Sequence, residues 1–478
     1  MNKTSFLEES LDLVGRILVI ISLVLVYIVV IGYMFISIPM GDDYWRATTH
    51  TITEALPLTL DVYDKWCGRW ASMFLQYSMW GGLGFKKELF FIEYRISIMM
   101  IAAISFIAIC WMIRLMTNKD WAKVLPWAAL FIGTYLSSYH SLGESVYWFP
   151  GAAEGGLASI CVGMVFWLTV MKGNKNVPEL VSKKYLLVVC FFSFVAPGLH
   201  EIAGLFLCAF FSLILIFMFL FGLPFRGKYI LISFIITLIA TSVSVFAPGN
   251  AIRAGIEFSN ADVSLSGSIN ALVQLWLRVG RVIFSPAFIV GSIIVILFSN
   301  KFKIFYYFPF PPKKSALISF LGFVALVGLS LLIAWKTSKI PAGRTVNFFA
   351  TVFILCCLPL ILYVFSTSIH NLLPKIIFKP LLFPLNIIFA FTIFLGSTLD
   401  RGLFSYKTNL LPWVKYQNDK HFTLCKSPPH SEIFLKPAPP APPLLFIEHD
   451  LKNSNSISNL AQERYYALKS IRILEVSQ

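Results

Sequence analysis

Two adjacent carboxylates follow the first long apolar run of the chain. Asp42 and Asp43 stand in Gly-Asp-Asp-Tyr-Trp, directly after residues 17–41, which carry no charged side chain. Neighbouring carboxylates repel each other, so the pKa of one can rise toward the range of a general base, and the pair can also ligate a divalent cation such as Mg²⁺ or Mn²⁺. The alternative interpretation is solvation of a helix end, with Tyr44 and Trp45 as interfacial aromatic residues.

A histidine and a glutamate form the second candidate for catalysis. His200 and Glu201 connect two apolar runs, 185–199 and 202–225, with no other residue between them. Ionisable groups held this close to a membrane are functional candidates, and this pair could transfer a proton or bind a metal. Two adjacent residues do not make a closed metal site, so a divalent cation would also need an aspartate, and Asp43 with Glu201 would be its ligands.

Three arginines have neighbours that suit anion binding. Arg69 lies between aromatic residues in Trp-Cys-Gly-Arg-Trp, where a guanidinium can bind a phosphate or a carboxylate through two hydrogen bonds. Arg253 and Arg344 each follow a Pro/Gly break at the end of an apolar run, and such breaks free backbone N–H groups that add to an anion site. The alternative is that Arg69 contacts lipid headgroups and that the prolines and glycines only end helices.

Three more residues are candidates for substrate binding. Glu144 and Trp148 lie in Ser-Leu-Gly-Glu-Ser-Val-Tyr-Trp-Phe-Pro-Gly, and aromatic rings beside a carboxylate suit the recognition of a sugar. The same composition is also typical of an interfacial loop. Asn250 belongs to the Pro-Gly-Asn break that precedes Arg253.

The elements that must position these residues are apolar helices. The chain has 478 residues, of which 57% are hydrophobic and 13% charged, and this excludes an ordinary soluble protein and a disordered one. A bilayer core needs about 17 to 25 helical residues to cross it, and most of the segments without charge or His qualify. We therefore expect an all-α polytopic membrane protein with about eleven transmembrane helices. The segments are 17–41, 96–113, 124–139, 155–171, 185–199, 202–225, 229–252, 282–300, 315–335, 345–369 and 380–399.

The distribution of charge predicts the orientation. The 39 Lys and Arg against 24 Asp and Glu give a net charge of +15, but the basic residues are dispersed in short loops, so nucleic acid is not an expected partner. The Lys- and Arg-rich loops all fall on one side, which the positive-inside rule makes cytoplasmic. The N-terminus is then cytoplasmic, and the C-terminus and the candidate residues are extracytoplasmic. These loops are 114–123, 172–184, 226–228, 301–314 and 375–379.

The composition divides the chain into two parts. Residues 1–399 form the transmembrane module, with a long first outer loop at 42–95, and the segment 253–281 is also expected to be an outer loop. Residues 400–478 form a small outside appendage whose Pro-rich stretch favours stiff polyproline-like spacers. The end of this tail, 459–476, has the apolar spacing of one amphipathic helix, or of a helix followed by a strand.

The motifs together resemble the GT-C superfamily of polyprenyl-phosphate-sugar glycosyltransferases. The chain is more closely similar to an uncharacterised bacterial family of GT-C-like multi-pass membrane proteins, and the similarity covers most of its length, apart from the Pro-rich insertion. The motifs are Gly41-Asp42-Asp43-Tyr44, Trp66-x-Gly68-Arg69, Gly198-Leu-His200-Glu201, Ala247-Pro248-Gly249-Asn250-x-x-Arg253 and Tyr465-Tyr466-x-x-Lys469-Ser470-Ile471.

This resemblance implies transfer of one hexosyl or pentosyl unit from a polyprenyl-phosphate donor to a glycan or lipid acceptor of the cell envelope. It implies a bacterial inner-membrane enzyme of polysaccharide biosynthesis, with Asp42 or Asp43 as the base, or as a metal ligand. The acceptor hydroxyl attacks while the departing phosphate gains charge, so one carboxylate and one or two cations are needed. We assign the phosphate to Arg253 and Arg344, with His200 and Glu201 orienting the groups and Arg69 as a further contact.

Other classes stay open at this point. An O-antigen polymerase or ligase also uses a lipid-linked glycan, but it relies on a large loop later in the chain. A lipid-linked glycan flippase or transporter needs ionisable residues in the middle of its spans, where this chain has almost none. A structural subunit has no need of acids and arginines gathered on one face.

Overall fold

The computed structural model describes most of the chain. The described residues are 3–39, 41–47, 52–81, 87–173, 175, 178–257, 264–302, 308, 310–337, 342–372, 381–396, 398–399, 402, 410–439, 442 and 457–473. The side chain of Asp42 and the loop 375–379 lie outside this part.

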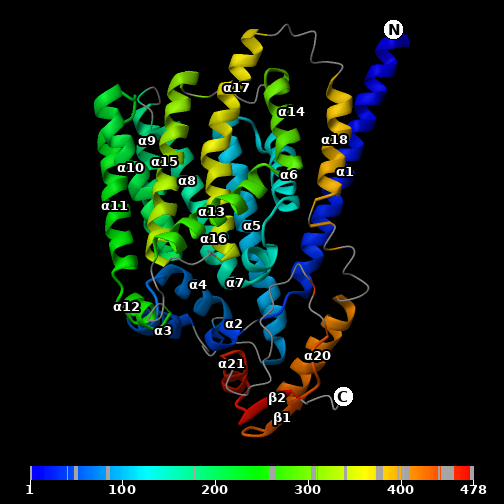
Figure 1. Ribbon diagram of the computed structural model, residues 1–478, viewed down its shortest axis with the longest axis vertical. Coiled ribbons are helices and arrows are strands. Elements are labelled where there is room, and N and C mark those ends of the chain that lie inside the picture. The colour runs from blue at the N-terminus through cyan, green and yellow to red at the C-terminus, as the bar shows by residue number, and fades with distance from the viewer. Residues whose placement is uncertain are drawn as a thin grey trace.

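Long apolar helices run side by side along the longest axis of the molecule (Figure 1). They form where apolar residues continue for several turns, because a backbone in lipid must satisfy its own hydrogen bonds. The bundle contains α1 (Lys3–Ile36), α5 (Phe90–Thr117), α6 (Trp121–Ser137), α8 (Ala158–Lys172), α9 (Glu179–Leu199), α10 (Glu201–Phe221), α11 (Gly227–Val245), α14 (Pro286–Phe302), α15 (Pro312–Thr337), α16 (Gly343–Val352), α17 (Leu358–Leu372) and α18 (Leu382–Phe394).

Within the described residues, eight helical stretches are long and apolar enough to cross a membrane. A ninth arises if α13 (Leu265–Ile283) and the first part of α14, which meet at 56°, form one bent span. Helices α6 and α18 have only 17 and 13 residues. The polytopic helical membrane protein is confirmed, whereas the number eleven and the GT-C fold stay predictions.

The first outer loop of the prediction, 42–95, is itself largely helical. It folds into α2 (Gly41–Arg46), α3 (Ile52–Lys65), α4 (Trp70–Gly81), the short 3-10 helix η1 (Lys87–Leu89) and the start of α5. Helices α2, α3 and α4 lie together at the lower end of the bundle in Figure 1, beside α12 (Pro248–Glu257). The N-terminus lies at the opposite, upper end.

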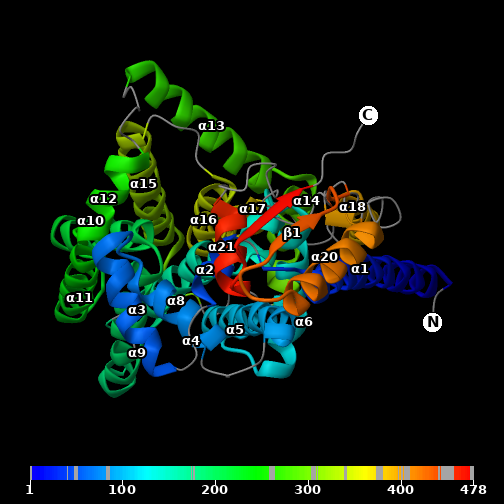
Figure 2. The same cartoon turned by 90° about the horizontal axis from the view of Figure 1, so that it is seen from below.

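The segment 253–281, predicted to lie on the outer side, is mostly helical, because α12 and α13 occupy most of it. Along α13, the exposed residues Leu265, Ile269, Val273 and Leu277 recur every fourth position, while Leu275 belongs to the buried side. This spacing defines one apolar stripe of a helix. Figure 2 shows α13 along the periphery of the molecule, where such a stripe can contact lipid.

The C-terminal tail differs from the expected spacer. It folds into α20 (Leu411–Lys426), β1 (Glu432–Leu435), α21 (Ile457–Tyr466) and β2 (Ser470–Ile473), and the two strands pair in parallel with Ile433 opposite Ile471. Strand β1 lies between the two proline groups and was not predicted, whereas the polyproline-like spacer at 436–443 stays a prediction. The prediction of a helix followed by a strand is confirmed.

This tail is packed on the first outer loop (Figures 1 and 2). Helix α21 lies against α2, where the rings of Tyr44 and Tyr465 have centroids 5.6 Å apart. The ring of His421 on α20 stacks on Phe91 at 4.0 Å, and its Nδ1 is 2.6 Å from the hydroxyl of Tyr466. The tail therefore covers the helix that carries Asp43.

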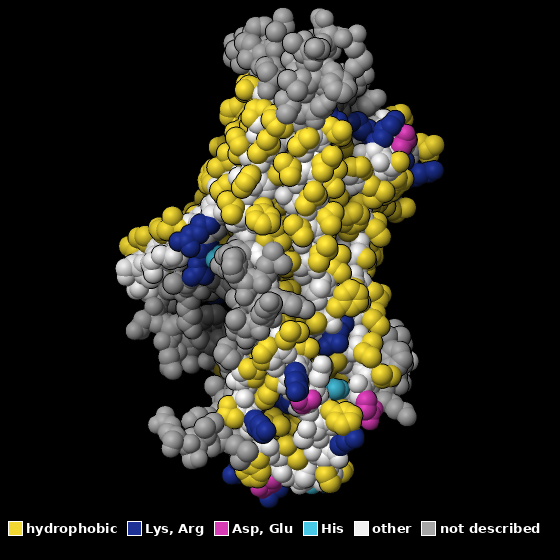
Figure 3. All heavy atoms as spheres, turned by 90° about the vertical axis from the view of Figure 1, so that its right-hand side faces the viewer, with side chains coloured by type: hydrophobic (Ala, Val, Ile, Leu, Met, Phe, Trp, Pro, Cys, Tyr) yellow, Lys and Arg dark blue, Asp and Glu magenta, His cyan; other side chains and the backbone are white. Residues whose placement is uncertain are grey.

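The core of the bundle surrounds α8. Of the apolar window over α8, 89% is buried, which makes α8 the central helix, and Phe166 and Trp167 are fully buried there. The outer helices turn apolar side chains to the surface. Figure 3 shows a broad band of hydrophobic side chains over the upper half of one face, with charged side chains at its upper edge and over its lower half. This distribution suits a bilayer around the upper band.

Candidate functional site

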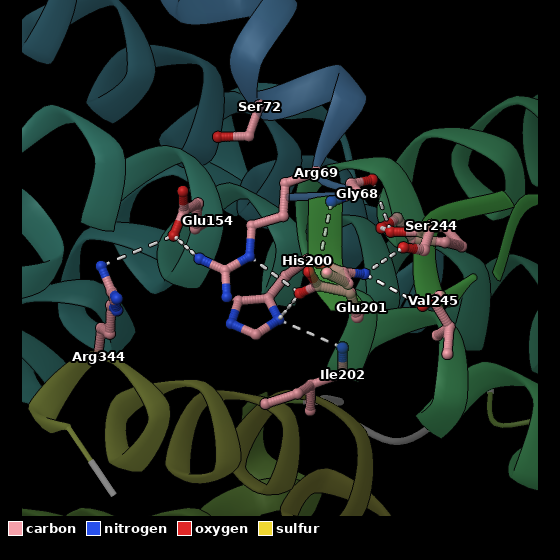
Figure 4. Close-up of polar contacts among 12 residues, drawn as sticks. Gly68, Arg69, Ser72, Glu154, His200, Glu201, Ile202, Ser244, Val245 and Arg344 are labelled. Atoms are coloured by element: carbon pink, nitrogen blue, oxygen red, sulfur yellow. Dashed lines mark hydrogen bonds and ion pairs between the residues drawn. The ribbon is translucent and has the colours of Figure 1, made fainter. Parts of the chain in front are cut away.

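Arg69 is the centre of a buried cluster of charges (Figure 4). Its Nη1 lies 2.5 Å from Oε2 of Glu154, and its Nε donates to Oε2 of Glu201 at 2.9 Å. Only 11% of the Arg69 side chain is exposed, and Glu154 is exposed by only 2%. One guanidinium at the start of α4 therefore joins Glu154, which lies just before α8, and Glu201 at the start of α10.

The electrostatics of this cluster depend on both carboxylates. Burial disfavours the charged guanidinium, but Glu154 and Glu201 outweigh this effect and hold the pKa of Arg69 above its usual value. Removing one partner of a buried ion pair typically costs about 3–5 kcal/mol, because it leaves a buried charge without compensation.

The backbone at Gly68 sets the position of Arg69. A Cβ at Gly68 would lie 1.8 Å from the carbonyl oxygen of Ser244, so only glycine permits the chain to pass this close to the end of α11. The hydroxyl of Ser244 donates to the Gly68 carbonyl at 2.9 Å. Arg69 then begins α4, since its carbonyl accepts the N–H of Met73.

Asn250, predicted to bind substrate, contacts the backbone of the protein. Its Oδ1 accepts from the Gly68 N–H at 3.1 Å, and its Nδ2 donates to the carbonyls of Ser244 and Val245 at 2.7 and 3.1 Å. Its amide thus clamps α11 and α12 onto the segment that precedes Arg69. Asn250 is a positioning residue in this structure.

His200 lies in the cluster as a neutral ring. Burial, aided by the nearby Arg69, lowers its pKa to about 3, and its Nδ1 accepts the backbone N–H of Ile202 at 3.2 Å. His200 is therefore the N-cap of α10. Its 3.4 Å contact with Glu201 is not an ion pair, because a neutral imidazole whose Nδ1 is an acceptor carries no charge there.

Arg344 closes the cluster from the side of α16. Its Nη1 is 3.7 Å from Oε2 of Glu154, its backbone N–H donates to Glu144 at 3.0 Å, and its guanidinium lies over the ring of Trp148 at 5.1 Å. With 28% of its side chain exposed, Arg344 is more accessible than Arg69. Three predicted residues thus meet here: Glu144, Trp148 and Arg344.

The two glutamates that contact Arg344 lie in π-helical turns. Glu144 belongs to η2 (Gly143–Tyr147) and Glu154 to η3 (Ala152–Leu157), on either side of the short α7 (Phe149–Gly151). Such widened turns are rare in helices and are frequent at functional sites. Here they bring Glu144 to the backbone N–H of Arg344 and Glu154 to its guanidinium.

Asp43 is fully buried on α2. It shares a side-chain hydrogen bond with Tyr94, whose hydroxyl also donates to the carbonyl of Tyr147 at 3.1 Å and accepts the N–H of Phe149 at 3.2 Å. These two backbone groups flank Trp148, the residue under Arg344. Tyr94 therefore links the predicted base to the predicted phosphate site.

Arg253 is the most peripheral of the predicted residues. It lies on α12 with a partly exposed side chain, and it acts electrostatically on Glu201. The structure thus brings together Asp43, His200, Glu201, Arg69, Glu144, Trp148, Asn250, Arg253 and Arg344 at one end of the bundle.

Two charged residues of this region were not predicted. Glu154 binds both Arg69 and Arg344, and its position inside an apolar span is a signal that could have identified it. Arg46 acts on Glu154 and donates to Gln76, which in turn donates to Ser72 at 2.7 Å. Its sequence surroundings carry no comparable signal.

The divalent cation stays a prediction. Within the described part of the chain, no group of three His, Cys, Asp or Glu side chains could hold a metal ion, and the side chain of Asp42 is not in that part. Arg69 already binds Oε2 of Glu201, so this carboxylate fits an ion pair better than a metal site.

Comparisons with known proteins do not assign this chain to a family. No protein-family model, no curated protein and no solved structure matches the chain.

Proposed function

We propose that this protein is a membrane glycosyltransferase that moves a sugar from a polyprenyl-phosphate donor to an acceptor hydroxyl at the end of the bundle that holds Arg69. The acceptor belongs to a glycan or lipid of the cell envelope. The proposal joins the motif resemblance to the chemistry of the site.

The observation that carries the proposal is the set of partners around the Arg344 guanidinium. Among the described residues, its guanidinium has one carboxylate at 3.7 Å, which is too long for a hydrogen bond, and one aromatic face. Its N–H donors are therefore available to a ligand. A stacked, partly exposed guanidinium at a membrane boundary suits a lipid phosphate, because its planar fork matches the oxygens of a phosphate.

The acids divide into two groups. Arg69 holds Glu154 and one oxygen of Glu201, so these carboxylates compensate charge. The other oxygen of Glu201, Oε1, is buried and has no hydrogen-bond partner within the described residues. This oxygen could accept a hydrogen bond from an acceptor hydroxyl. We assign the proton-accepting role to Asp43, which Tyr94 links to the backbone on either side of Trp148, the residue that Arg344 covers.

The reaction needs few steps. An acceptor oxygen forms a bond to the anomeric carbon of the sugar while the bond from that carbon to the donor phosphate oxygen breaks. The acceptor proton goes to Asp43, and the departing lipid phosphate keeps the electron pair and its added charge. Arg344 stabilises that charge, with Arg253 as the second cation.

The test measures the surface glycan of a strain that lacks the protein, complemented with variants. We expect the deletion to remove one sugar, and we expect neither Asp43→Asn nor Arg344→Ala to restore it. Loss of one donor to a developing oxyanion typically lowers kcat by about 10²–10³-fold. Asp64→Asn and Arg281→Ala are matched controls, since both side chains are exposed and lie on neighbouring helices.

Two outcomes contradict the proposal. One is an unchanged glycan in the deletion strain. The other is a complete glycan in strains whose Asp43→Asn and Arg344→Ala proteins reach the membrane at the level of the controls.

A further inference from the structure

A second feature of the molecule lies inside the helix bundle. A partly open cavity of about 180 Å³ lies between α5, α6, α14 and α17, which pack side by side (Figure 1). Its described lining is apolar except for Thr117, Lys119, Thr134 and Ser292. Apolar cavities of this size stay dry and bind apolar molecules. Inside the membrane, the apolar groups available to fill the cavity are the hydrocarbon chains of lipids.

The cavity is separated from the charged site by a layer of hydrogen bonds. The hydroxyls of Tyr135 and Thr351 contact each other, Thr351 donates to the carbonyl of Asn347 at 2.6 Å, and Asn347 donates to Ser145 at 2.9 Å. All four residues are buried. A chain whose phosphate lay on Arg344 would have to break this layer to enter the cavity.

One helical face passes through all three regions. Arg344 at the site, Asn347 and Thr351 in the polar layer, and Leu355 and Leu358 in the cavity follow each other at spacings of three and four residues along α16, η4 (Phe353–Cys357) and α17. Residues at these spacings share a face of a helix. The order along the face places the cavity on the far side of the polar layer from Arg344.

The far end of the cavity carries a cation. Lys119 lies in the turn between α5 and α6 and lines the cavity with Thr117. Lysines at the end of a membrane helix reach toward the phosphates of lipid headgroups while their stems lie on apolar surface. A phosphate at Lys119 would place its attached chain along the apolar wall formed by α5 and α6.

We propose that the cavity binds one chain of a membrane phospholipid, with the phosphate at Lys119. The site is distinct from the transferase site and does not depend on the proposed reaction. The charges of the loops predict that it opens toward the cytoplasmic leaflet.

Trp167 provides a reporter of the chain. Its ring lines the cavity, yet the residue is fully buried in the centre of the bundle, and its Nε1 donates to the carbonyl of Leu355 at 2.7 Å. Bromine atoms on a lipid chain quench tryptophan on contact, so lipid around the protein does not reach Trp167. Quenching of Trp167 requires a chain inside the cavity.

The experiment uses the full-length protein in detergent micelles, titrated with phosphatidylglycerol brominated on its chains. The emission of Trp167 is obtained by subtracting the fluorescence emission of Trp167→Phe from that of the native protein. We expect this emission to be quenched, and we expect Ser292→Phe, which fills the cavity, to abolish the quenching. Lys119→Gln should raise the lipid fraction for half-maximal quenching roughly fivefold. Lys123→Gln is the matched control, because Lys123 is exposed in the same region and does not line the cavity.

Three results overturn the proposal. The first is emission of Trp167 that saturating brominated phospholipid leaves unchanged. The second is an equal midpoint for Lys119→Gln and Lys123→Gln, a comparison that does not need Ser292→Phe to fold. The third is that polyprenyl phosphate displaces the brominated chain while Lys119→Gln leaves the midpoint of quenching unchanged. The occupant of the cavity would then be the polyprenyl-phosphate donor.

Discussion

At the scale of residues, the sequence predicted members of the site but not their pairing. Arg69, His200 and Glu201 could be identified because each ionisable side chain stands against an apolar background. The partner of Arg69, Glu154, is 85 residues away, and only the packing of α4 on the bundle makes them neighbours. Proton transfer by His200 stays a prediction, while burial lowers the pKa of this ring and its Nδ1 caps α10.

The burial of His200 predicts how stability depends on pH. Its pKa is about 3 in the folded protein against 6.5 for an ordinary histidine, so below pH 6.5 the unfolded chain binds a proton that the folded protein does not. The stability that His200 contributes is therefore lost as the pH falls below 6.5. Between pH 6.5 and 5 this loss is about 2 kcal/mol, at about 1.4 kcal/mol per unit.

The measurement is the thermal unfolding midpoint in micelles between pH 7.5 and 5. His200→Asn keeps an N-cap acceptor for α10, and we expect its midpoint to depend less on pH than that of the native protein. His430→Asn, at an exposed position, is the control. The charged residues that act on His200 are present in both proteins; they are Glu154, Glu201, Arg69 and Arg344. Identical pH profiles for the native protein and His200→Asn would contradict the neutral buried state of His200.

At the scale of elements, the long apolar helices were predictable, whereas α13 was missed. Searching for segments without charge omits most of α13, because Arg278 and Arg281 lie inside it, although the apolar spacing of a helix is present there. Strand β1 was missed because prolines flank it, and its partner β2 is distant in sequence. Close approaches between elements, such as that of Gly68 to Ser244, depend on tertiary packing and carry only the weak signal of a glycine.

Gly68 therefore offers a test of how the elements hold the site. Gly68→Ala places a Cβ within 1.8 Å of the Ser244 carbonyl oxygen, so the segment must shift and Arg69 moves with it. We expect a loss of stability of roughly 1–3 kcal/mol, as in overpacked cores, together with loss of the glycan product. Denaturant unfolding in micelles measures the first and complementation the second.

Gly255→Ala is the matched control on α12. A Cβ there meets no atom within 4 Å, so we expect it to leave the glycan unchanged and to stabilise the helix by about 0.5–1 kcal/mol. Equal stability of the two alanine variants would contradict the close approach at Gly68.

At the scale of the whole molecule, the arrangement has two different ends. The upper end holds the N-terminus, and the lower end holds the charged site, the first outer loop and the C-terminal tail (Figure 1). The positive-inside rule predicts the upper end to face the cytoplasm. Length and apolar composition, which identify the spans, do not fix this direction.

Labelling of introduced cysteines tests the direction. We expect a membrane-impermeant maleimide to label Thr423→Cys on intact cells and to label Lys123→Cys only after the membrane is opened, since both side chains are exposed and the two lie on α20 and α6. Cys425→Ser in both variants removes the native thiol nearest to the first position. If only Lys123→Cys were labelled on intact cells, the topology would be the reverse of the predicted one.

The packing of α21 on α2 also has a consequence for the order of synthesis. A ribosome releases α2 long before α21, so Asp43 is synthesised before every later helix of the bundle. The aromatic neighbours of Tyr44, Tyr465 and Tyr466, emerge only after the helices of the bundle. The surroundings of Asp43 are therefore completed only after the whole bundle has been synthesised.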